Sequence, residues 1–339
     1  MIAQLNKDYI FTRPLKVFPR LLSYFFYEGR PATTKGRWFN PVTFMALRNN
    51  SKANHDTNCE SPVFITGTGR SGSTILGMVL SMHKDVGFLN EPKALWFHAN
   101  PNDDLIGSYT AADARYRMSE NDASDQIANT VKSIYSSYLN FSGTKRIVDK
   151  FPEMIFRIEY LNKIFKNPKF IFLYRNPWDT IASTALWSET HRNENKHEDW
   201  WGVNNRKWNL LLEQIIPYDP SLAKYQEIIS SFKKESDKAA VEWITTMNFG
   251  INKMLLFPKQ IIPVRYEDLA MDPIKSLQLI CEFTDLDRDE TFLNFGKKIL
   301  RPAPGNKKIQ IHPVLSTAID ELSERLGYLS HSPSISVTE

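Results

Sequence analysis

The chain has few of the features that mark specialised classes of protein. Only two of its 339 residues are cysteine, Cys59 and Cys281, and their distance in the sequence argues against a zinc site or a disulfide scaffold. We therefore expect reduced thiols, as is usual for a cytoplasmic protein. No apolar run reaches the length of a membrane span, and the first eight residues lack the apolar core of a signal peptide.

The chain also lacks a strong excess of charge of one sign. Its net charge is +4, and its basic pairs are scattered along the sequence, whereas nucleic-acid-binding proteins usually concentrate them on one element. We therefore expect no nucleic-acid partner. The mild excess of basic residues fits either an ordinary solvated surface or a positive rim around an anionic cofactor. A hydrophobic content of 42% supplies enough apolar side chains for a sizeable core.

The first sixty residues show mixed polarity and no clean periodicity, and the polar residues 49–60 predict a linker. This pattern predicts an N-terminal extension over residues 1–60, a main domain over residues 61–330 and a flexible tail over residues 331–339. Residues 14–27 (PLKVFPRLLSYFFY) are aromatic and basic. We favour packing of this segment across the main domain; the alternative is peripheral contact with a membrane surface.

From residue 61 onward, predicted strands alternate with predicted helices. Short apolar runs predict strands over residues 62–66, 85–89, 145–149, 169–174 and 260–266. Helices are predicted over residues 74–82, 155–165, 177–186 and 274–283. This alternation predicts an α/β fold in which a parallel sheet carries helices on both faces. Ligands bind such sheets at the carboxyl ends of the strands.

A glycine-rich segment, GTGRSGST at residues 67–74, lies between the first predicted strand and helix. Glycines let backbone N–H groups approach a phosphate, and the helix N-terminus adds positive potential. The segment fits the dinucleotide-binding pattern G-x-G-x-x-G, with Glu91 as a ribose-binding acid, but Arg70 would crowd the cofactor. It also fits the Walker A pattern, except that Ser73 replaces the lysine that a nucleotide triphosphatase needs.

A second segment with suitable chemistry follows the fourth predicted strand, as RNPWDTIAS at residues 175–183. Pro177 suits the first turn of a helix, where its missing N–H costs nothing. Arg175 at the strand end and Ser183, two turns into the helix, can face one anion. An arginine can clamp a phosphate through two hydrogen bonds, and a serine hydroxyl can donate a third.

The segments at 67–74 and 173–183 together resemble the nucleotide-binding motifs of the sulfotransferases. Members of that family have a P-loop nucleotide-binding fold and transfer the sulfuryl group of 3′-phosphoadenosine 5′-phosphosulfate (PAPS) to a hydroxyl, releasing 3′-phosphoadenosine 5′-phosphate (PAP). The resemblance implies that Arg175 and Ser183 bind the 3′-phosphate. The residues that it implies for the 5′-phosphosulfate are Gly69, where proline is common, Arg70, Ser71, Gly72, Ser73 and Thr74. We expect no metal, because the donor has no β,γ-diphosphate for magnesium to bridge.

The resemblance also implies catalytic residues. A glutamate after the second strand is the general base in the Golgi-type and bacterial carbohydrate, lipid and tyrosine sulfotransferases, and Glu91 stands there. His98 nearby remains an alternative base. Lys150, in a D-K-x-P segment, resembles the lysine that contacts the sulfuryl group, and Arg70 is the third catalytic candidate. Further along the chain, Lys307 and Lys308 are candidates for a basic loop over the 3′-phosphate.

The acceptor is not readable from the sequence beyond a hydroxyl of a carbohydrate, lipid or other small molecule. Residues 187–208, rich in tryptophan, fit an acceptor lid or core packing equally well. Two other functions stay open, namely a P-loop kinase or nucleotidase and a nucleotide-binding protein without catalytic activity. No recognisable dimer motif indicates the oligomeric state.

Overall fold

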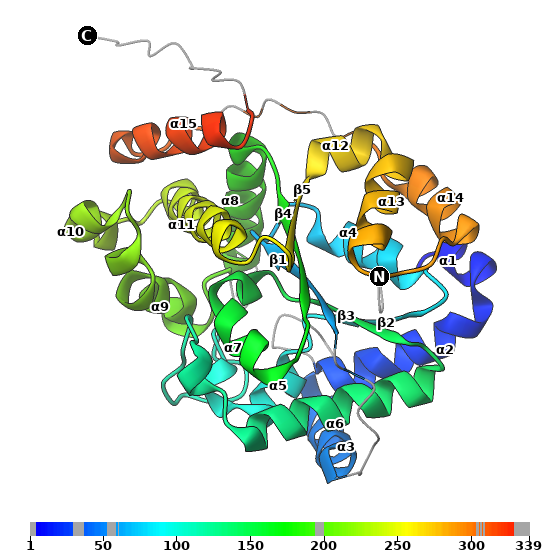
Figure 1. Cartoon of the computed structure of the whole chain (residues 1–339). Helices are drawn as coiled ribbons and strands as arrows, with labels where there is room; N and C mark the ends of the chain where they lie inside the picture. Colours follow the sequence, from blue (N-terminus) through cyan, green and yellow to red (C-terminus); the bar gives the residue numbers. More distant parts are fainter. Residues whose placement is uncertain are drawn as a thin grey trace.

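The computed structural model describes residues 5–29, 37–52, 59, 61–193, 200–302, 305, 307 and 309–328, so Lys308 and the tail at 331–339 lie outside the described residues. A five-stranded sheet forms its centre, with strand order β2-β3-β1-β4-β5 and every neighbouring pair parallel (Figure 1). The strands are β1 Val63–Gly67, β2 Val86–Asn90, β3 Arg146–Lys150, β4 Lys169–Tyr174 and β5 Ile261–Arg265. The predicted α/β fold with a parallel sheet is confirmed.

The strands β1, β2 and β3 begin and end one residue later than predicted. In the pair β2 and β3, Asn90 lies opposite Lys150, so pairing continues through two polar residues beyond the apolar runs. Backbone hydrogen bonds do not depend on side-chain polarity, and an apolar run therefore marks a strand without fixing its last residue. The shift carries the strands up to the edge where the candidate site lies.

Helices cover both faces of the sheet. The helices after β1 are α4 Ser73–Ser81, α5 Lys93–Ala99, α6 Asp125–Ser142, α7 Ile158–Ile164, α8 Pro177–Asn193, α9 Arg206–Gln214, α10 Gln226–Ser230, α11 Glu235–Leu256, α12 Tyr266–Met271, α13 Pro273–Phe283, α14 Glu290–Ile299 and α15 Ser316–Arg325. The helix predicted over residues 155–165 starts as a 3₁₀ helix, Pro152–Arg157, before α7. This change of helix type follows the proline at position 152, directly after β3.

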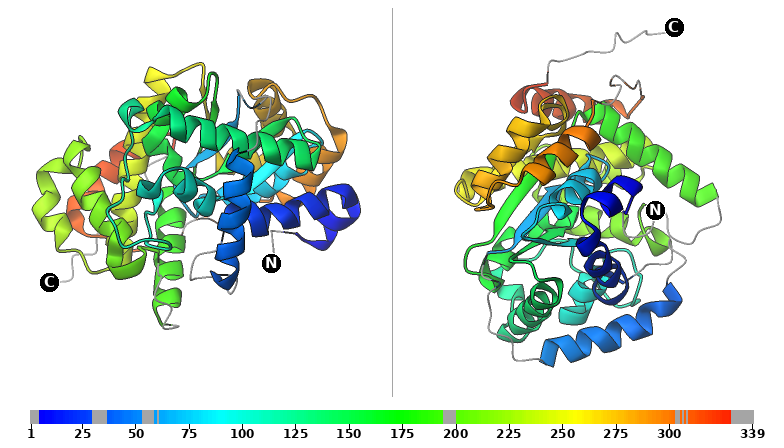
Figure 2. Two further views of the ribbon diagram at one scale, coloured as in Figure 1. Left: turned by 90° about the horizontal axis from the view of Figure 1, so that it is seen from below. Right: turned by 90° about the vertical axis from the view of Figure 1, so that its right-hand side faces the viewer.

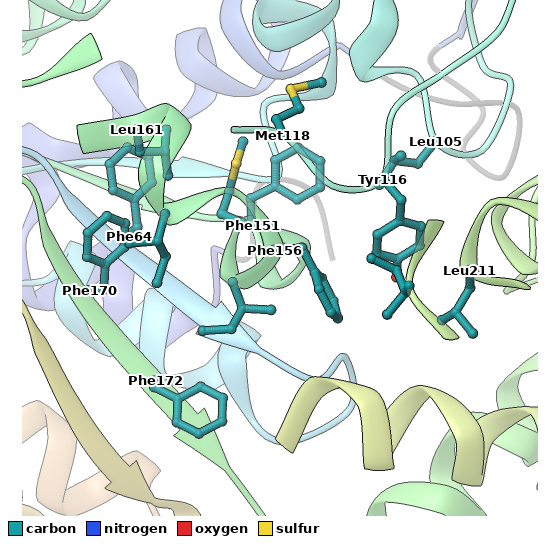
Figure 3. Close-up of a cluster of buried hydrophobic side chains, with 14 of the residues drawn as sticks. Phe64, Leu105, Tyr116, Met118, Phe151, Phe156, Leu161, Phe170, Phe172 and Leu211 are labelled. Atoms are coloured by element: carbon teal, nitrogen blue, oxygen red, sulfur yellow. The ribbon is translucent and has the colours of Figure 1, made fainter. Parts of the chain in front are cut away.

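Two apolar clusters fill the space between the sheet and its helices. Because side chains alternate along a strand, Phe64 points to one face of β1 while Val63 and Ile65 point to the other. The larger cluster packs Phe64, Phe170 and Phe172 against α6, α7 and α11 (Figure 3). The smaller cluster packs the opposite face against α4, α13 and α14.

A buried carboxyl lies within the larger cluster. Asp149 is fully buried on β3, and its Oδ2 accepts hydrogen bonds from Trp96 Nε1 at 2.9 Å and from Tyr135 Oη at 2.5 Å. Burial disfavours the charged form and raises the pKa of Asp149 to about 7, although the two hydrogen bonds lower it. The protonated carboxyl is therefore the form that favours the folded state.

We expect this titration to appear in the pH dependence of stability. The folded-state pKa of Asp149 exceeds its unfolded value, so its contribution is fully present below about pH 4 and is lost as the pH rises through about 7. Asp149→Asn keeps an oxygen acceptor but cannot ionise. Its melting temperature should fall less than that of the wild type between about pH 4 and pH 8. Parallel pH profiles of the two proteins would contradict this assignment.

The N-terminal segment is helical, which the sequence pattern did not predict. Its helices are α1 Lys7–Thr12, α2 Pro14–Ser23 and α3 Asn40–Lys52, and a π-helical turn, Tyr24–Glu28, continues α2. The predicted polar linker is thus wrong over residues 49–52, which belong to α3. The helix α2 lies beside the edge strand β2, whereas α1 packs against α4 and α14 through Tyr9 (Figure 1, Figure 2). None of the described helices is long and apolar enough to cross a membrane.

Candidate functional site

Four neighbouring strands bring the predicted residues to one edge of the sheet. The glycine-rich loop follows β1, Glu91 follows β2, Lys150 ends β3, and Arg175 follows β4. Since these strands are parallel and adjacent, their carboxyl ends lie side by side. The segments are separated by up to a hundred residues in the sequence, and the sheet is what assembles them.

The loop after β1 has the backbone of an anion-binding turn. Arg70 and Gly72 have φ angles of 66° and 97°, and Ser71 Oγ donates a hydrogen bond to the Thr68 carbonyl at 2.5 Å. No side chain in the described part of the chain caps the N-terminus of α4, which starts at Ser73. Its first N–H groups are therefore available to an anion, with the helix dipole favouring negative charge.

Two aromatic side chains pack against the loop, and each requires a glycine. A Cβ at Gly72 would lie 2.4 Å from the Tyr266 ring, and a Cβ at Gly69 would lie 2.2 Å from the Trp200 ring. Trp200 is fixed by a hydrogen bond from Nε1 to Glu242 Oε2 at 2.6 Å. The close approach of Trp200 also gives a physical reason for glycine at position 69, because a proline ring there would collide with the indole.

Glu91 and Lys150 form an ion pair at the ends of β2 and β3. The buried Lys150 ammonium donates a hydrogen bond to Glu91 Oε1, and the Lys93 ammonium lies 3.7 Å from Oε2. The Glu91 N–H donates to the Lys150 carbonyl at 2.7 Å. Burial opposes ionisation of Glu91, but the charges of Lys150 and Lys93 outweigh it and lower the pKa of Glu91 to about 2. Its carboxylate is therefore ionised at neutral pH.

Backbone strain also marks this edge. Within the described ranges, five residues other than glycine have positive φ: Arg70, Glu91, Asn204, Asn205 and Asp285. Asn and Asp adopt this conformation readily, whereas Arg and Glu seldom do. Strained residues gather at functional sites, where the surrounding structure holds them in place. The two unusual cases, Arg70 and Glu91, are both predicted site residues.

The segment after β4 adjoins the loop. Ser183 Oγ accepts a hydrogen bond from Arg70 Nε at 3.1 Å, which joins the two predicted phosphate-binding segments directly. The guanidinium of Arg175 lies 4.7 Å from the centre of the Tyr266 ring and 3.6 Å from Asp179 Oδ2. Burial lowers the pKa of Arg70, and the positive charge of Arg175 lowers it further. Two cations held this close favour the binding of an anion.

An acidic residue in the first turn of a helix, such as Asp179 in α8, is expected to help cap it, but the structure differs. The Asn176 side chain caps this helix, accepting hydrogen bonds from the N–H groups of Trp178 at 3.0 Å and Asp179 at 3.3 Å. Asp179 instead pairs with Arg175 and accepts a long hydrogen bond, 3.5 Å, from the Lys307 N–H. Lys307 is exposed beside the predicted 3′-phosphate site, whereas Lys308 lies outside the described residues.

The charged side chain that acts on His98 is Arg48, whereas Lys150 and Lys93 act on Glu91. His98 lies on α5, where partial burial lowers its pKa, and the positive charge of Arg48 on α3 lowers it further. Beside Glu91, a small recess is lined by Lys93, Glu153 and the apolar side chains of Leu105, Tyr109 and Phe151. The described residues contain no group of three or more His, Cys, Asp or Glu side chains that could hold a metal ion.

Comparison with known proteins identifies the family. A sequence model described as the Sulfotransferase family matches residues 62–290, which is more than half of the chain. The chain belongs to the sulfotransferase family. The matched range contains the glycine-rich loop, Glu91, Lys150, Arg175 and Ser183, and it confirms the resemblance drawn from the sequence motifs.

A curated relative in this comparison is the nodulation protein NoeE of Sinorhizobium fredii (strain NBRC 101917 / NGR234). It is 27% identical over 128 residues, which cover 35% of this chain and 30% of that protein. The chain thus spans less than one third of the length of that relative.

Several solved sulfotransferases are similar in structure. The sulfotransferase domain of the curacin biosynthetic pathway is 16% identical with a TM-score of 0.48, covering 79% of this chain and 98% of that one. STF9 from Mycobacterium avium is 12% identical with a TM-score of 0.47, covering 95% and 91%. Mouse SULT7A1 complexed with PAP is 15% identical with a TM-score of 0.38, covering 79% and 85%.

Within this sulfotransferase fold, the sequence interpretation missed three side chains beside the loop. Tyr266 supports both Gly72 and Arg175, and its place directly after β5 could have indicated it. Trp200 covers Gly69, and the ammonium of Lys207 lies 4.8 Å from the Trp200 ring. Lys207 is buried and pairs with Glu153 at 2.7 Å and Glu242 at 2.6 Å. No local pattern distinguishes Trp200 or Lys207 from ordinary core residues.

The tryptophan-rich segment divides between core and site. Trp201 and Trp208 are buried and contact each other at 5.5 Å between ring centres, as expected for core packing. Trp200 faces the glycine-rich loop, and Trp187 stacks on His191 with ring centres 3.7 Å apart. The role of this segment as an acceptor lid stays a prediction.

Proposed function

We propose that the protein transfers the sulfuryl group of PAPS to a hydroxyl of a carbohydrate, lipid or other small-molecule acceptor. The observation that carries this proposal is the hydrogen bond between Arg70 and Ser183, because it unites two anion-binding segments with different tasks. One lies at a helix N-terminus and lacks the Walker lysine, and the other carries Arg175. This arrangement suits a nucleotide with separate 3′- and 5′-phosphates.

In this proposal the chain holds the donor at two points. The N–H groups of the glycine-rich loop bind the 5′-phosphosulfate. The 3′-phosphate is bound by Arg175 and Ser183, together with the basic segment that contains Lys307 and Lys308. The loop residues concerned are Gly69, Arg70, Ser71, Gly72, Ser73 and Thr74. Tyr266 contacts both halves of the donor site, since its ring lies beneath Gly72 and against Arg175. We assign it the role of holding these two halves in register.

The proposed reaction uses the ion pair beside this loop. The acceptor hydroxyl gives its proton to the Glu91 carboxylate, its oxygen forms a bond to sulfur, and the bond from sulfur to the 5′-phosphate oxygen breaks. Electron density moves onto the leaving PAP. Lys150 stabilises the charge that develops on the sulfuryl and bridging oxygens, and Arg70 acts on the phosphate side. An ammonium has three donors, so Lys150 can contact Glu91 and the donor together.

The recess beside Glu91 is the proposed approach of the acceptor. Lys93 lies 3.7 Å from the Glu91 carboxylate and also lines the recess, so the recess adjoins the proposed base. Its lining combines apolar side chains with the charged side chains of Lys93, Asp103, Asp104 and Glu153. This mixture fits an acceptor that has both apolar and hydroxyl-bearing parts.

Arg175→Ala should remove most of the preference for a 3′-phosphate. A hydrogen bond to a charged group is worth about 1.5–3 kcal/mol, so PAP affinity should fall roughly ten- to over a hundred-fold while weak AMP binding is spared. Calorimetry with both nucleotides measures the change. Arg288→Ala, which removes an exposed arginine that pairs with Glu290 at the start of α14, serves as the control. Equal losses for PAP and AMP would contradict the assignment.

The catalytic part of the proposal is tested by an acceptor screen. Purified protein is incubated with PAPS and pools of carbohydrates, lipids and small hydroxylated molecules, and products are followed by mass spectrometry. We expect one acceptor class to gain a sulfuryl group while PAP accumulates in equal amount. Tight PAP binding without turnover across all pools would instead favour a nucleotide-binding protein without catalytic activity.

A further inference from the structure

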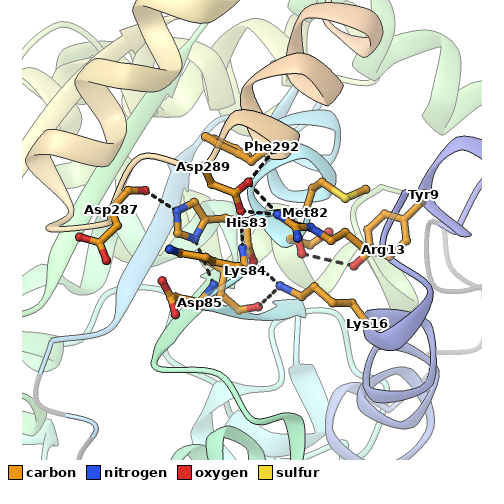
Figure 4. A network of polar contacts seen from close by, with 12 residues as sticks. Tyr9, Arg13, Lys16, Met82, His83, Lys84, Asp85, Asp287, Asp289 and Phe292 are labelled. Atoms are coloured by element: carbon orange, nitrogen blue, oxygen red, sulfur yellow. Dashed lines mark hydrogen bonds and ion pairs between the residues drawn. The ribbon is translucent and has the colours of Figure 1, made fainter. Parts of the chain in front are cut away.

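The helix α2 and its π-helical continuation turn polar side chains toward the protein. Lys16, Arg20 and Ser23 follow helical spacing on the inward face, and Arg20 pairs with the buried Glu28. A surface helix of a globular protein usually has the opposite orientation, with its apolar stripe toward the core. Figure 4 shows the first part of this interface, where Tyr9, Arg13 and Lys16 meet the turn between α4 and β2.

The edge strand β2 explains the polar inward face. An edge strand presents unpaired N–H and C=O groups, and these need partners. The Lys16 ammonium donates to the Val86 carbonyl at 2.8 Å and also to the His83 carbonyl, while Glu28 Oε1 accepts from the Asn90 N–H at 3.0 Å. The polar residues of α2 therefore bind the backbone at the edge of the sheet, and the apolar residues of α2 face outward.

Apolar side chains on the outward side of α1 and α2 are exposed. Leu15 and Phe18 of α2 are 91% and 63% exposed, and Phe11 near the end of α1, which the non-helical Arg13 separates from α2, is 82% exposed. We call these three residues the outer stripe. The Phe18 ring contacts the exposed Phe141 of α6, with ring centres 6.2 Å apart. Further along, Phe25 contacts Phe39, which in turn contacts the exposed Trp38.

The same part of the chain carries the net positive charge of the protein. Residues 1–52 contain nine Lys and Arg against two Asp and Glu, a net charge of +7, whereas the whole chain has +4. The rest of the protein is therefore slightly acidic. Lys7, Arg48 and Lys52 are exposed on α1 and α3. A cationic segment with exposed aromatic and aliphatic side chains complements an anionic, partly apolar surface.

We propose that the outer stripe and the exposed basic residues of α1 and α3 dock the protein on an anionic membrane surface. The outer stripe inserts between lipid headgroups and acyl chains, and the exposed lysines and arginines contact lipid phosphates. The helix lies in the plane of the interface and does not span the bilayer. Because Glu28 accepts a hydrogen bond from the Asn90 N–H, the docked helix is linked to the C-terminal end of β2, directly before Glu91.

Vesicle sedimentation with the full chain tests this proposal. We expect binding to phosphatidylcholine vesicles that contain about one third phosphatidylglycerol, little binding to phosphatidylcholine alone, and weakening at about 0.5 M NaCl. Replacing the outer stripe together (Phe11→Ser, Leu15→Ser, Phe18→Ser) should lower the vesicle partition coefficient by about tenfold or more. The matched control replaces Leu255, Leu256 and Met271, three exposed apolar residues elsewhere, by serine and should bind as the wild type does.

Three results would overturn the proposal. One is equal vesicle binding by the wild type and the outer-stripe variant while both retain PAP binding and the same melting temperature. Another is a wild type that forms dimers in light-scattering measurements while the outer-stripe variant is monomeric, which would make this face an interface between two copies of the chain. The third is a folded wild type that does not bind anionic vesicles, whatever the result of the acceptor screen.

Discussion

Glu91→Gln should lower the turnover number by about 10²–10⁴-fold while PAP affinity changes little. The glutamine side chain has nearly the same shape but cannot accept the acceptor's proton. With its pKa near 2, the wild-type carboxylate stays ionised across the physiological range, so protonation of Glu91 should not limit the rate between about pH 5 and pH 8. Steady-state kinetics with PAPS and the acceptor found by screening measure both effects.

A control must separate catalysis from folding, because Glu91→Gln also removes the charge partner of the buried Lys150. Glu91→Asp keeps the charge on a shorter side chain and should recover part of the lost turnover. Melting temperatures and PAP affinities of both variants report on folding. If Glu91→Gln turns over at a near-normal rate, Glu91 is not the base, and His98→Ala becomes the decisive variant.

Lys150→Ala should lower kcat by about 10²–10³-fold, more than it weakens the binding of PAP. The ammonium of Lys150 lies at the end of β3 beside Glu91, where it can act on charge that appears only during transfer. Lys93→Ala is the matched control, because Lys93 approaches the same carboxylate from a more exposed position. Its effect on kcat should be much smaller.

A purely structural role of Lys150 predicts a different result. In that case Lys150→Ala would lower the melting temperature, and the folded fraction of the variant would turn over normally. The double variant Lys150→Ala, Glu91→Gln adds a further check, since residues that act as one unit show far less than additive losses.

The sequence predicted which edge of the sheet carries the candidate site residues, because these residues lie in short, local sequence patterns. The loop at 67–74 and the segment at 175–183 each join a strand to a helix, and short patterns of residue types encode such junctions. The parallel sheet then brings the junctions together, so predicting the sheet was enough to predict their proximity. The match of the Sulfotransferase family to residues 62–290 supports this interpretation of the motifs.

What the sequence did not predict depends on contacts between distant segments. Trp200 covers Gly69 across more than a hundred residues, and no periodicity records that approach. The helix α2 departs from the usual pattern because its polar face points inward, where residues such as Lys16 bind the backbone of the edge strand. Tyr266 is a different case, because it ends the strand predicted over residues 260–266, so its position at a strand end was visible in the sequence.

The central claim is that the site binds a nucleotide with a 3′-phosphate and no 5′-triphosphate. Calorimetry of the full chain with PAP, AMP and ATP, each with and without magnesium, tests it most directly. Ser73 stands where the Walker lysine would contact β- and γ-phosphates, whereas Arg175 follows the neighbouring strand β4 and Ser183 lies in α8. We expect PAP to bind about ten- to over a hundred-fold more tightly than AMP or ATP, without a need for magnesium. Tighter binding of ATP that depends on magnesium would contradict the sulfotransferase account and restore the kinase.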